Sequence, residues 1–227
     1  MFKKFFEQLH WKTLARQLRR PKGTLGHKVA SKMNEANEFL YYFTLDQMEL
    51  RNGLSVLEIG FGNGKFFDKL FNRAQQLQIT GIDFSDLMVK AAIKNNETSI
   101  AAGKLSILKG QSDQLPFADN SFDIVFCINV AYFWNETGKH LQEINRVLKP
   151  GGKLYTTIRT KESIEKMPFT KYGFKSYTEE DWKLLAHQHN LLYKKGVLVS
   201  EPAIEHEGSE IRSQSLCLIT EKKNVYV

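Results

Sequence analysis

Two kinds of hydrophobic pattern alternate along most of the chain, and they mark the expected strands and helices. From about Leu54 onward, short runs of β-branched, aliphatic and aromatic residues are separated by longer segments with helical periodicity. This alternation favours an α/β fold with a parallel sheet and helices on both faces, in which ligands bind at the carboxyl ends of the strands. The expected strands cover residues 55–59, 78–83, 105–109, 122–128, 153–158, 191–199 and 215–220.

Helix signals lie between these strands. Lys149–Gly152 (KPGG) supplies Pro and Gly just past a helix C-terminus. Thr178 and Asp181 have the spacing of a capping box. The polar segment 201–212 is expected to be a loop. The expected helices cover residues 65–77, Ser85 to about Lys94, a segment ending near Leu148, and Thr178 to about His189.

The first 50 residues follow a different pattern, which predicts helices only. Arg20-Pro21 and Gly23 interrupt the first helix, and a second helix is expected over residues 28–49. We therefore expect an N-terminal helical cap over residues 1–50, followed by one α/β domain over residues 51–227. In the first helix, Phe2, Phe5, Phe6 and Leu9 share one face, and Trp11, Leu14 and Leu18 fall on roughly the opposite face.

The net charge is concentrated at the N-terminus. The chain has 32 Lys and Arg against 25 Asp and Glu, a formal net charge of +7. Residues 1–30 hold eight basic side chains and one acid, so they account for all of it. The balanced remainder argues against a nucleic-acid-binding face on the main body. A basic segment beside an apolar helical face predicts contact of residues 1–30 with an anionic membrane surface, although these charges could also be merely solvated.

Other features narrow the class of protein. The longest apolar runs have five residues, whereas a membrane-spanning helix needs about 20. Cys127 and Cys217 are too few for a disulfide framework, and we expect them to be reduced in a cytoplasmic protein, with peripheral membrane association through the basic segment. His187 and His189 point to different faces of their helix, so no metal site is expected.

The strongest chemical signal is a strand that runs into three closely spaced glycines, Gly60, Gly62 and Gly64. Glycines let the backbone approach a ligand closely, and the following helix N-terminus favours an anionic group. The dinucleotide pattern G-x-G-x-x-G fails because Lys65 occupies its sixth position, and the Gly-Lys-Ser/Thr of a phosphate-binding loop is absent. Glu58, directly before the turn, disfavours a pyrophosphate and suits a cationic ligand.

A second signal is Asp83, which ends the next strand in the sequence Gly81-Ile82-Asp83. A carboxylate at this position can accept hydrogen bonds from both hydroxyls of a ribose. The alternative is that Asp83 only caps the helix that begins at Ser85. Two further signals are Gly110–Asp123, which contains LPF and SFD, and Arg146–Gly152 (RVLKPGG).

Taken in order, these four segments resemble the motif set of the class I S-adenosylmethionine-dependent methyltransferases. The similarity is greatest to the small-molecule group that includes the quinone-biosynthesis methyltransferases, and it covers about residues 54–158. The resemblance implies a Rossmann-like methyltransferase fold: a doubly wound, seven-stranded, mostly parallel sheet whose last strand is antiparallel.

The resemblance also implies S-adenosylmethionine as cofactor, together with the residues that would bind it. Gln111 stands where members of this family often carry Asp, and its carbonyl can still accept a hydrogen bond from the adenine amino group. The implied cofactor residues are Glu58, Gly60, Gly62 and Gly64 toward the methionine end, Asp83 at the ribose, Phe84 against the adenine, Gln111 and Ser112 at the adenine edge, and Asn129 near the methionine moiety.

The predicted reaction is transfer of a methyl group to a small-molecule acceptor by in-line displacement. Because the donor is already activated, the protein has mainly to position and desolvate the reactants. No general base is singled out, and the candidates are His10, His27, Tyr41 and Tyr132. Tyr132-Phe133-Trp134 could line a substrate pocket or simply pack in the core.

Two other functions stay open at this point. One is a methyltransferase that acts on RNA. The other is a non-catalytic protein that binds a membrane surface or RNA and uses the same fold as a scaffold. Both rest on the basic segment 1–30 alone.

Overall fold

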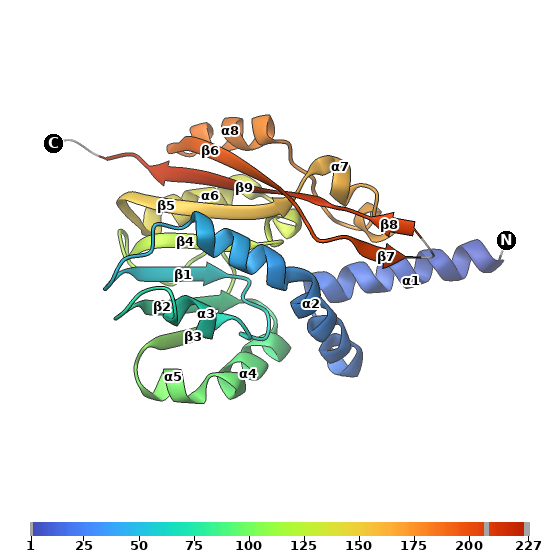
Figure 1. Cartoon of the computed structure of the whole chain (residues 1–227), viewed down its shortest axis with the longest axis horizontal. Coiled ribbons are helices and arrows are strands. Elements are labelled where there is room, and N and C mark those ends of the chain that lie inside the picture. The colour runs from blue at the N-terminus through green and yellow to red at the C-terminus, as the bar shows by residue number, and fades with distance from the viewer. Residues whose placement is uncertain (1, 207–208, 225–227) are drawn as a thin grey trace.

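A seven-stranded mixed sheet forms the centre of the molecule (Figure 1). The computed structural model describes residues 2–206 and 209–224, and at residues 2–6, 204–206, 209 and 211 it describes the backbone alone. β9 runs antiparallel to both of its neighbours, and all other adjacent pairs are parallel, which confirms the expected sheet. The strand order is β3 (Leu105–Lys109), β2 (Gln78–Asp83), β1 (Ser55–Ile59), β4 (Phe122–Ile128), β5 (Leu148–Arg159), β9 (Gln214–Lys222) and β6 (Leu191–Ser200).

Helices cover both faces of this sheet, and each face has its own apolar core. One core contains Leu141 and Trp182 of α6 and α8, and the other contains Leu40 and Phe67 of α2 and α3. The fold is therefore doubly wound, as expected. The helices are α1 (Phe2–Arg19), α2 (Gly23–Gln47), α3 (Phe67–Phe71), α4 (Asp86–Asn95), α5 (Glu97–Ala101), α6 (Thr137–Val147), α7 (Lys161–Ile164) and α8 (Glu179–Gln188), with short 3₁₀ turns η1 (Ala131–Phe133) and η2 (Pro168–Lys171).

Several expected elements are confirmed residue by residue. The strands predicted over residues 55–59, 78–83, 105–109 and 122–128 have the bounds of β1, β2, β3 and β4. The capping box of α8 is also present. The Thr178 hydroxyl oxygen accepts from the Asp181 backbone N–H, and the Asp181 carboxylate accepts from the Thr178 backbone N–H. These are the places where a purely local pattern determines the element.

α3 is shorter than the helix expected over residues 65–77. The segment after Phe71 bonds to the loop before β1 instead of continuing the helix: the Gln75 N–H donates to Asn52 Oδ1 at 2.9 Å, and the Gly53 N–H donates to the Gln75 carbonyl at 3.0 Å. Gln76 then adopts a left-handed conformation with φ of 57°. These partners are distant in sequence, so the helical pattern did not reveal them.

Three other expectations need correction. β5 begins at Leu148 rather than residue 153, because α6 passes directly into the strand and the register against β4 is irregular near Phe122. α2 begins at Gly23 rather than residue 28. The segment 201–212, expected to be a loop, contains a short antiparallel pair, β7 (Ile204–His206) and β8 (Ser209–Ile211). Strands of three residues are too short to produce a recognisable period.

The second half of α2 is part of the domain core. Leu40, Tyr41 and Leu45 are at most 2% exposed, and the hydroxyl of Thr44 lies 2.7 Å from that of Thr157 on β5. The first half of α2 and all of α1 extend beyond the carboxyl ends of the strands (Figure 1). The boundary expected at residue 50 falls in the loop between α2 and β1, but α2 shares the core of the domain that follows it.

α1 contacts the body through the face that contains Ala15. Phe2, Phe5 and Phe6 lie outside the described side chains, and Leu9 is 48% exposed. Ala15, by contrast, is buried, and α1 contacts α2 and η2. Over the residues whose structure is described, no helix is both long and apolar enough to cross a membrane.

We expect Leu40→Ala to destabilise the whole domain, because Leu40 is fully buried between α2 and the sheet. Replacing a buried leucine by alanine costs about 2–5 kcal/mol, including the cavity that it leaves. Urea unfolding measured on Leu40→Ala and on Leu25→Ala, whose leucine is 46% exposed, provides the comparison. Equal small losses for both variants would mean that α2 is a detachable cap.

Candidate active site

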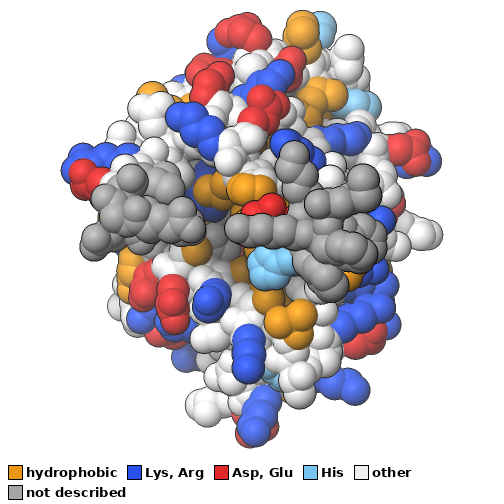
Figure 2. Space-filling model, turned by 90° about the vertical axis from the view of Figure 1, so that its right-hand side faces the viewer, with side chains coloured by type: hydrophobic (Ala, Val, Ile, Leu, Met, Phe, Trp, Pro, Cys, Tyr) orange, Lys and Arg blue, Asp and Glu red, His pale blue; other side chains and the backbone are white. Residues whose placement is uncertain are grey.

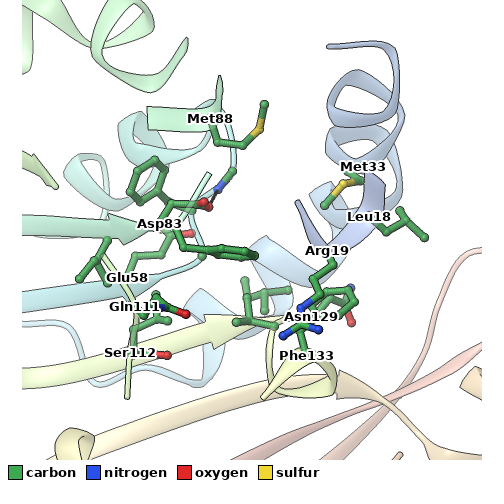
Figure 3. A pocket seen from close by; sticks show the side chains of 18 of the residues that line it. Leu18, Arg19, Met33, Glu58, Asp83, Met88, Gln111, Ser112, Asn129 and Phe133 are labelled. Carbon is green, nitrogen blue, oxygen red and sulfur yellow. Dashed lines mark hydrogen bonds between the residues drawn. The ribbon is translucent and has the colours of Figure 1, made fainter. Parts of the chain in front are cut away.

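A cavity of about 210 Å³ lies at the carboxyl ends of β1, β2 and β4 (Figure 3). The junction of α1 and α2 covers it, and the segment after β4 forms a further wall. Of the nine residues predicted to bind the cofactor, only Gly64 lies outside the lining of this cavity. The eight that line it are Glu58, Gly60, Gly62, Asp83, Phe84, Gln111, Ser112 and Asn129.

The glycine-rich turn allows two close approaches that a side chain would prevent. A Cβ atom at residue 60 would lie 2.4 Å from a methyl carbon of Val130, and φ at this residue is 73°. At Gly64, which has φ of 68°, a Cβ atom would lie 2.8 Å from both Ala92 and Asn96 of the α4 region. Gly64 therefore packs the turn against α4, and Gly60 lets the end of β1 lie beside the residue after β4.

Glu58 is a buried carboxyl group at the end of β1, with 6% of its surface exposed. It accepts a hydrogen bond of 3.0 Å from the hydroxyl of Tyr41 on α2. Burial raises the pKa of Glu58 to about 8, and the nearby Asp83 adds a smaller upward contribution. A cationic group placed beside Glu58 would favour its ionised form.

Asp83 ends β2 and is held by two backbone donors. Its Oδ1 accepts from the Ser85 N–H at 2.8 Å, and its Oδ2 accepts from the Gly62 N–H at 3.1 Å. Burial raises the pKa of Asp83 to about 6, against the lowering effect of these two hydrogen bonds. The carboxylate thus connects the glycine turn to the start of α4 while one side of it faces the cavity.

Ser112 has a partner that the sequence did not reveal. Its hydroxyl lies 2.7 Å from Nδ1 of His140, and the imidazole stacks on Trp134 with ring centroids 4.8 Å apart. Burial lowers the pKa of His140 to about 4, so the ring is neutral at physiological pH. His140 comes from α6, and no local motif connects it with Ser112.

Asn129 follows β4 in a left-handed conformation with φ of 56°. Its amide nitrogen donates to Asn37 Oδ1 of α2 at 2.9 Å, and its own oxygen accepts from the Tyr132 hydroxyl at 2.9 Å. The Asn129 amide therefore joins α2 to the segment that follows β4, to which Tyr132 also belongs.

The candidates for a general base are placed differently. Tyr41 lines the cavity, but its pKa is raised well above the ordinary value, chiefly by burial. Tyr132 is buried behind Asn129 and does not line the cavity, and burial also raises its pKa. His10 and His27 are exposed and do not line it either. Of the predicted aromatic run, Phe133 and Trp134 line the cavity.

The cover of the cavity contains side chains that sequence reasoning did not assign to a site. α1 and α2 contribute Leu18, Arg19, Met33, Asn34 and Asn37. They could be recognised only once the helices are placed over the strand ends. In the part of the chain that the structure describes, no three His, Cys, Asp or Glu side chains are grouped in a way that could hold a metal ion.

Comparison with known proteins gives consistent results. Residues 57–156 match the family described as methyltransferase domain. The uncharacterized methyltransferase YdaC of Bacillus subtilis is 30% identical over 131 residues, which span 58% of this chain and 70% of that protein. The ubiquinone/menaquinone biosynthesis C-methyltransferase UbiE of Klebsiella pneumoniae is 28% identical over 184 residues, which span 75% of this chain and 69% of that protein.

Among solved structures, a chain from the complex of the Haloferax volcanii Trm112 methyltransferase activator with a methyltransferase has a similar fold. The TM-score is 0.75 at 19% sequence identity, over 87% of this chain and 94% of that chain. The family match spans β1 to β5, the part of the sheet whose strand ends form the cavity. The chain belongs to the class I S-adenosylmethionine-dependent methyltransferases and is an enzyme that uses S-adenosylmethionine as its methyl donor.

Proposed function

We propose that the methyl acceptor is a small molecule, bound in the same cavity beside the cofactor. The observation that carries this proposal is the cover: α1, α2 and residues 133–136 line the cavity together with the cofactor residues. A cavity covered by helices in this way suits a compact acceptor rather than a length of RNA. The name of UbiE, a ubiquinone/menaquinone biosynthesis C-methyltransferase, supports an acceptor of this class.

The residues present fit the cofactor. The Glu58 carboxyl is buried beside the cavity, and among the described residues Tyr41 is its hydrogen-bond partner, so a positively charged group would complete its environment. Gly62 has φ of 61° and open space where a Cβ atom would lie, which lets a ligand approach the backbone. We assign Glu58 and the glycine turn to the methionine end of S-adenosylmethionine.

The remaining cofactor contacts follow from their order along the strand ends. We assign Asp83 to the ribose hydroxyls and Phe84 to the face of the adenine. Gln111 and Ser112 lie on the next loop and would reach the adenine edge, with His140 orienting the Ser112 hydroxyl. Asn129 is assigned to the methionine moiety.

Bound S-adenosylmethionine supplies a methyl group on a sulfonium, which the acceptor takes by in-line displacement. The chain contributes position and the exclusion of water. Leu18, Met33 and Phe133 bring apolar surface to the acceptor side of the cavity, and removal of water strengthens the electrostatic contacts inside it. We assign no general base, because none of the four candidates combines access to the cavity with a suitable pKa.

The surface gives less support to the two alternative functions. At the end of the molecule that contains the cavity, basic side chains are interspersed with acidic ones (Figure 2). Arg20 of the basic segment turns toward the body and pairs with Asp86 at 3.7 Å. Exposed Lys12 and Arg16 lie near Leu9, so contact with an anionic membrane stays a prediction.

Incubation of the enzyme and methyl-labelled S-adenosylmethionine with a cell extract tests the class of acceptor. We expect label in the small-molecule or lipid fraction, because the cavity is bounded by α1 and α2. The extract is separated into lipid, small-molecule, RNA and protein pools, with enzyme carrying Asp83→Ala as the control. Label that accumulates chiefly in RNA would contradict the small-molecule assignment.

We expect Asp83→Ala to weaken the binding of S-adenosylhomocysteine by roughly 100-fold, because hydrogen bonds to a charged group contribute about 1.5–3 kcal/mol each. Stability should also fall by about 1–2 kcal/mol, since the Gly62 and Ser85 N–H groups lose their acceptor. Calorimetry and thermal unfolding on the same samples separate the loss of affinity from the loss of stability. The control is Asp68→Ala, which removes an exposed carboxylate of α3. Lower stability with unchanged affinity would mean that Asp83 stabilises the local turn and does not bind the ligand.

Binding should also release a proton from Glu58. With a pKa of about 8, this carboxyl is mostly protonated at pH 6–7, whereas a cationic ligand requires its ionised form. Affinity for S-adenosylhomocysteine should therefore rise with pH between 5.5 and 7, a range in which the ligand's amino group stays protonated. The rise should approach about tenfold per pH unit, with an added contribution from Asp83, whose pKa is about 6, at the lower end of this range.

Calorimetry at pH 6.5 in two buffers of different ionisation enthalpy measures this proton directly. Glu58→Gln should bind more weakly and show a much smaller difference in enthalpy between the two buffers, the remainder coming from Asp83, whose pKa is about 6. If the wild-type enthalpy is already independent of the buffer, Glu58 does not ionise on binding.

A further inference from the structure

Arg19, the last residue of α1, extends into the cavity from its cover, toward Asn129 and Phe133 (Figure 3). Its side chain is half-buried. The one hydrogen bond that it makes among the described residues is long: Nη2 donates to Asn135 Oδ1 at 3.3 Å. That acceptor is a neutral amide, so the guanidinium charge is not balanced by it.

The other arginines that are at least partly enclosed have carboxylate partners. Arg159 pairs with Glu201 through two hydrogen bonds of 2.8 and 2.7 Å. Arg146 forms a similar pair with Glu143. Arg19 therefore differs from the general arrangement in this protein, where an enclosed guanidinium meets an acid.

The charges around the cavity do not neutralise Arg19. Among the described lining residues it is the one cationic side chain, since His140 is neutral. Glu58 and Asp83 lie on the other side of the cavity from it (Figure 3). Two further acids line the cavity: the carboxylate of Glu136 is paired with Lys139 at 2.8 Å, and Asp113, on the loop after β3, forms no ion pair with Arg19 among the described residues.

The position of Arg19 is fixed by contacts on both sides of it. The Ser85 hydroxyl donates to the Pro21 carbonyl at 3.0 Å, and Arg20 lies 5.4 Å over the Phe84 ring. The Lys22 N–H donates to the side chain of Gln17 at 2.8 Å. The end of α1 is thus attached to the start of α4, and Arg19 is held over the cavity.

A cation near a helix C-terminus is favourable wherever its side chain points. Arg16, in the same last turn, gains that benefit while exposed to solvent. The helix end alone therefore does not account for a guanidinium directed into a cavity lined by Leu18, Met33 and Phe133. Because the Arg19 side chain is only partly exposed, an anionic ligand in the cavity would interact with it more strongly than with an arginine on the open surface.

We propose that Arg19 binds a carboxylate inside the cavity, with the amide of Asn37 as a second donor. Asn37 lines the cavity, and its oxygen is occupied by Asn129, so N–H is the group that it offers to a ligand. A planar guanidinium matches the two oxygens of a carboxylate. The carboxylate belongs either to the methionine end of the cofactor or to an acid group of the acceptor. This inference rests on the proposed function of the cavity.

The test compares wild type, Arg19→Gln and Arg16→Gln, the last as a matched control on the same helix. Calorimetry with S-adenosylhomocysteine and with 5′-methylthioadenosine, which lacks the amino-acid portion, forms the first arm. In the second arm, protein saturated with S-adenosylhomocysteine is titrated with octanoate and with the neutral octanamide. Thermal unfolding shows that each variant is folded.

If the carboxylate is that of the cofactor, Arg19→Gln should weaken S-adenosylhomocysteine by about 10- to 100-fold and leave 5′-methylthioadenosine within about twofold. If it belongs to the acceptor, both nucleosides should bind normally, wild type should prefer octanoate to octanamide, and Arg19→Gln should lose that preference. Arg16→Gln should match wild type in both arms.

Two results would overturn the assignment of Arg19 alone. One is an Arg19→Gln variant that behaves as wild type in both arms. The other is an equal loss of affinity for both nucleosides, which would show that Arg19 only supports the cover. If wild type itself binds no S-adenosylhomocysteine, the proposed cofactor site fails first, and the Arg19 assignment fails with it.

Discussion

The cavity depends on how closely the end of β1 approaches the residue that follows β4. A side chain at position 60 would lie 2.4 Å from Val130, so the approach requires glycine. The turn that follows sends the Gly62 N–H to the carboxylate of Asp83 at the end of β2. Three strand ends are therefore joined within one turn, and Glu58, Asp83 and Asn129 face the same space. The arrangement of these polar groups is a consequence of backbone packing.

The same packing gives the site its electrostatic character. Glu58 and Asp83 are both nearly inaccessible to water, and burial raises the pKa of each. Two carboxyl groups in this position are costly for the free protein, and a ligand with positive charge and hydroxyl donors relieves that cost. In the free protein, the Tyr41 hydroxyl donates one hydrogen bond to Glu58. The site is thus organised for a cation before the ligand arrives.

The sheet and the grouping of eight predicted residues around one cavity could be predicted because they rest on local sequence. Strands such as β2 and β4 are short apolar runs with clear ends, and Asp83 and the glycines stand at those ends. His140 and Arg19 could not be found in this way. His140 reaches Ser112 from α6, and Arg19 reaches the cavity from α1, so each depends on how a helix packs against a strand end far away in the sequence.

In the sequence, residues 1–30 form one basic segment, but the fold places the charges of this segment in different surroundings. Lys12 and Arg16 face solvent, whereas Arg20 pairs with Asp86 and Arg19 enters the cavity. The end of α1 therefore has two structural roles: Leu18 helps to enclose the cavity, and Arg19 brings a charge into it. A ligand that binds Arg19 would therefore also contact the helix that covers the cavity.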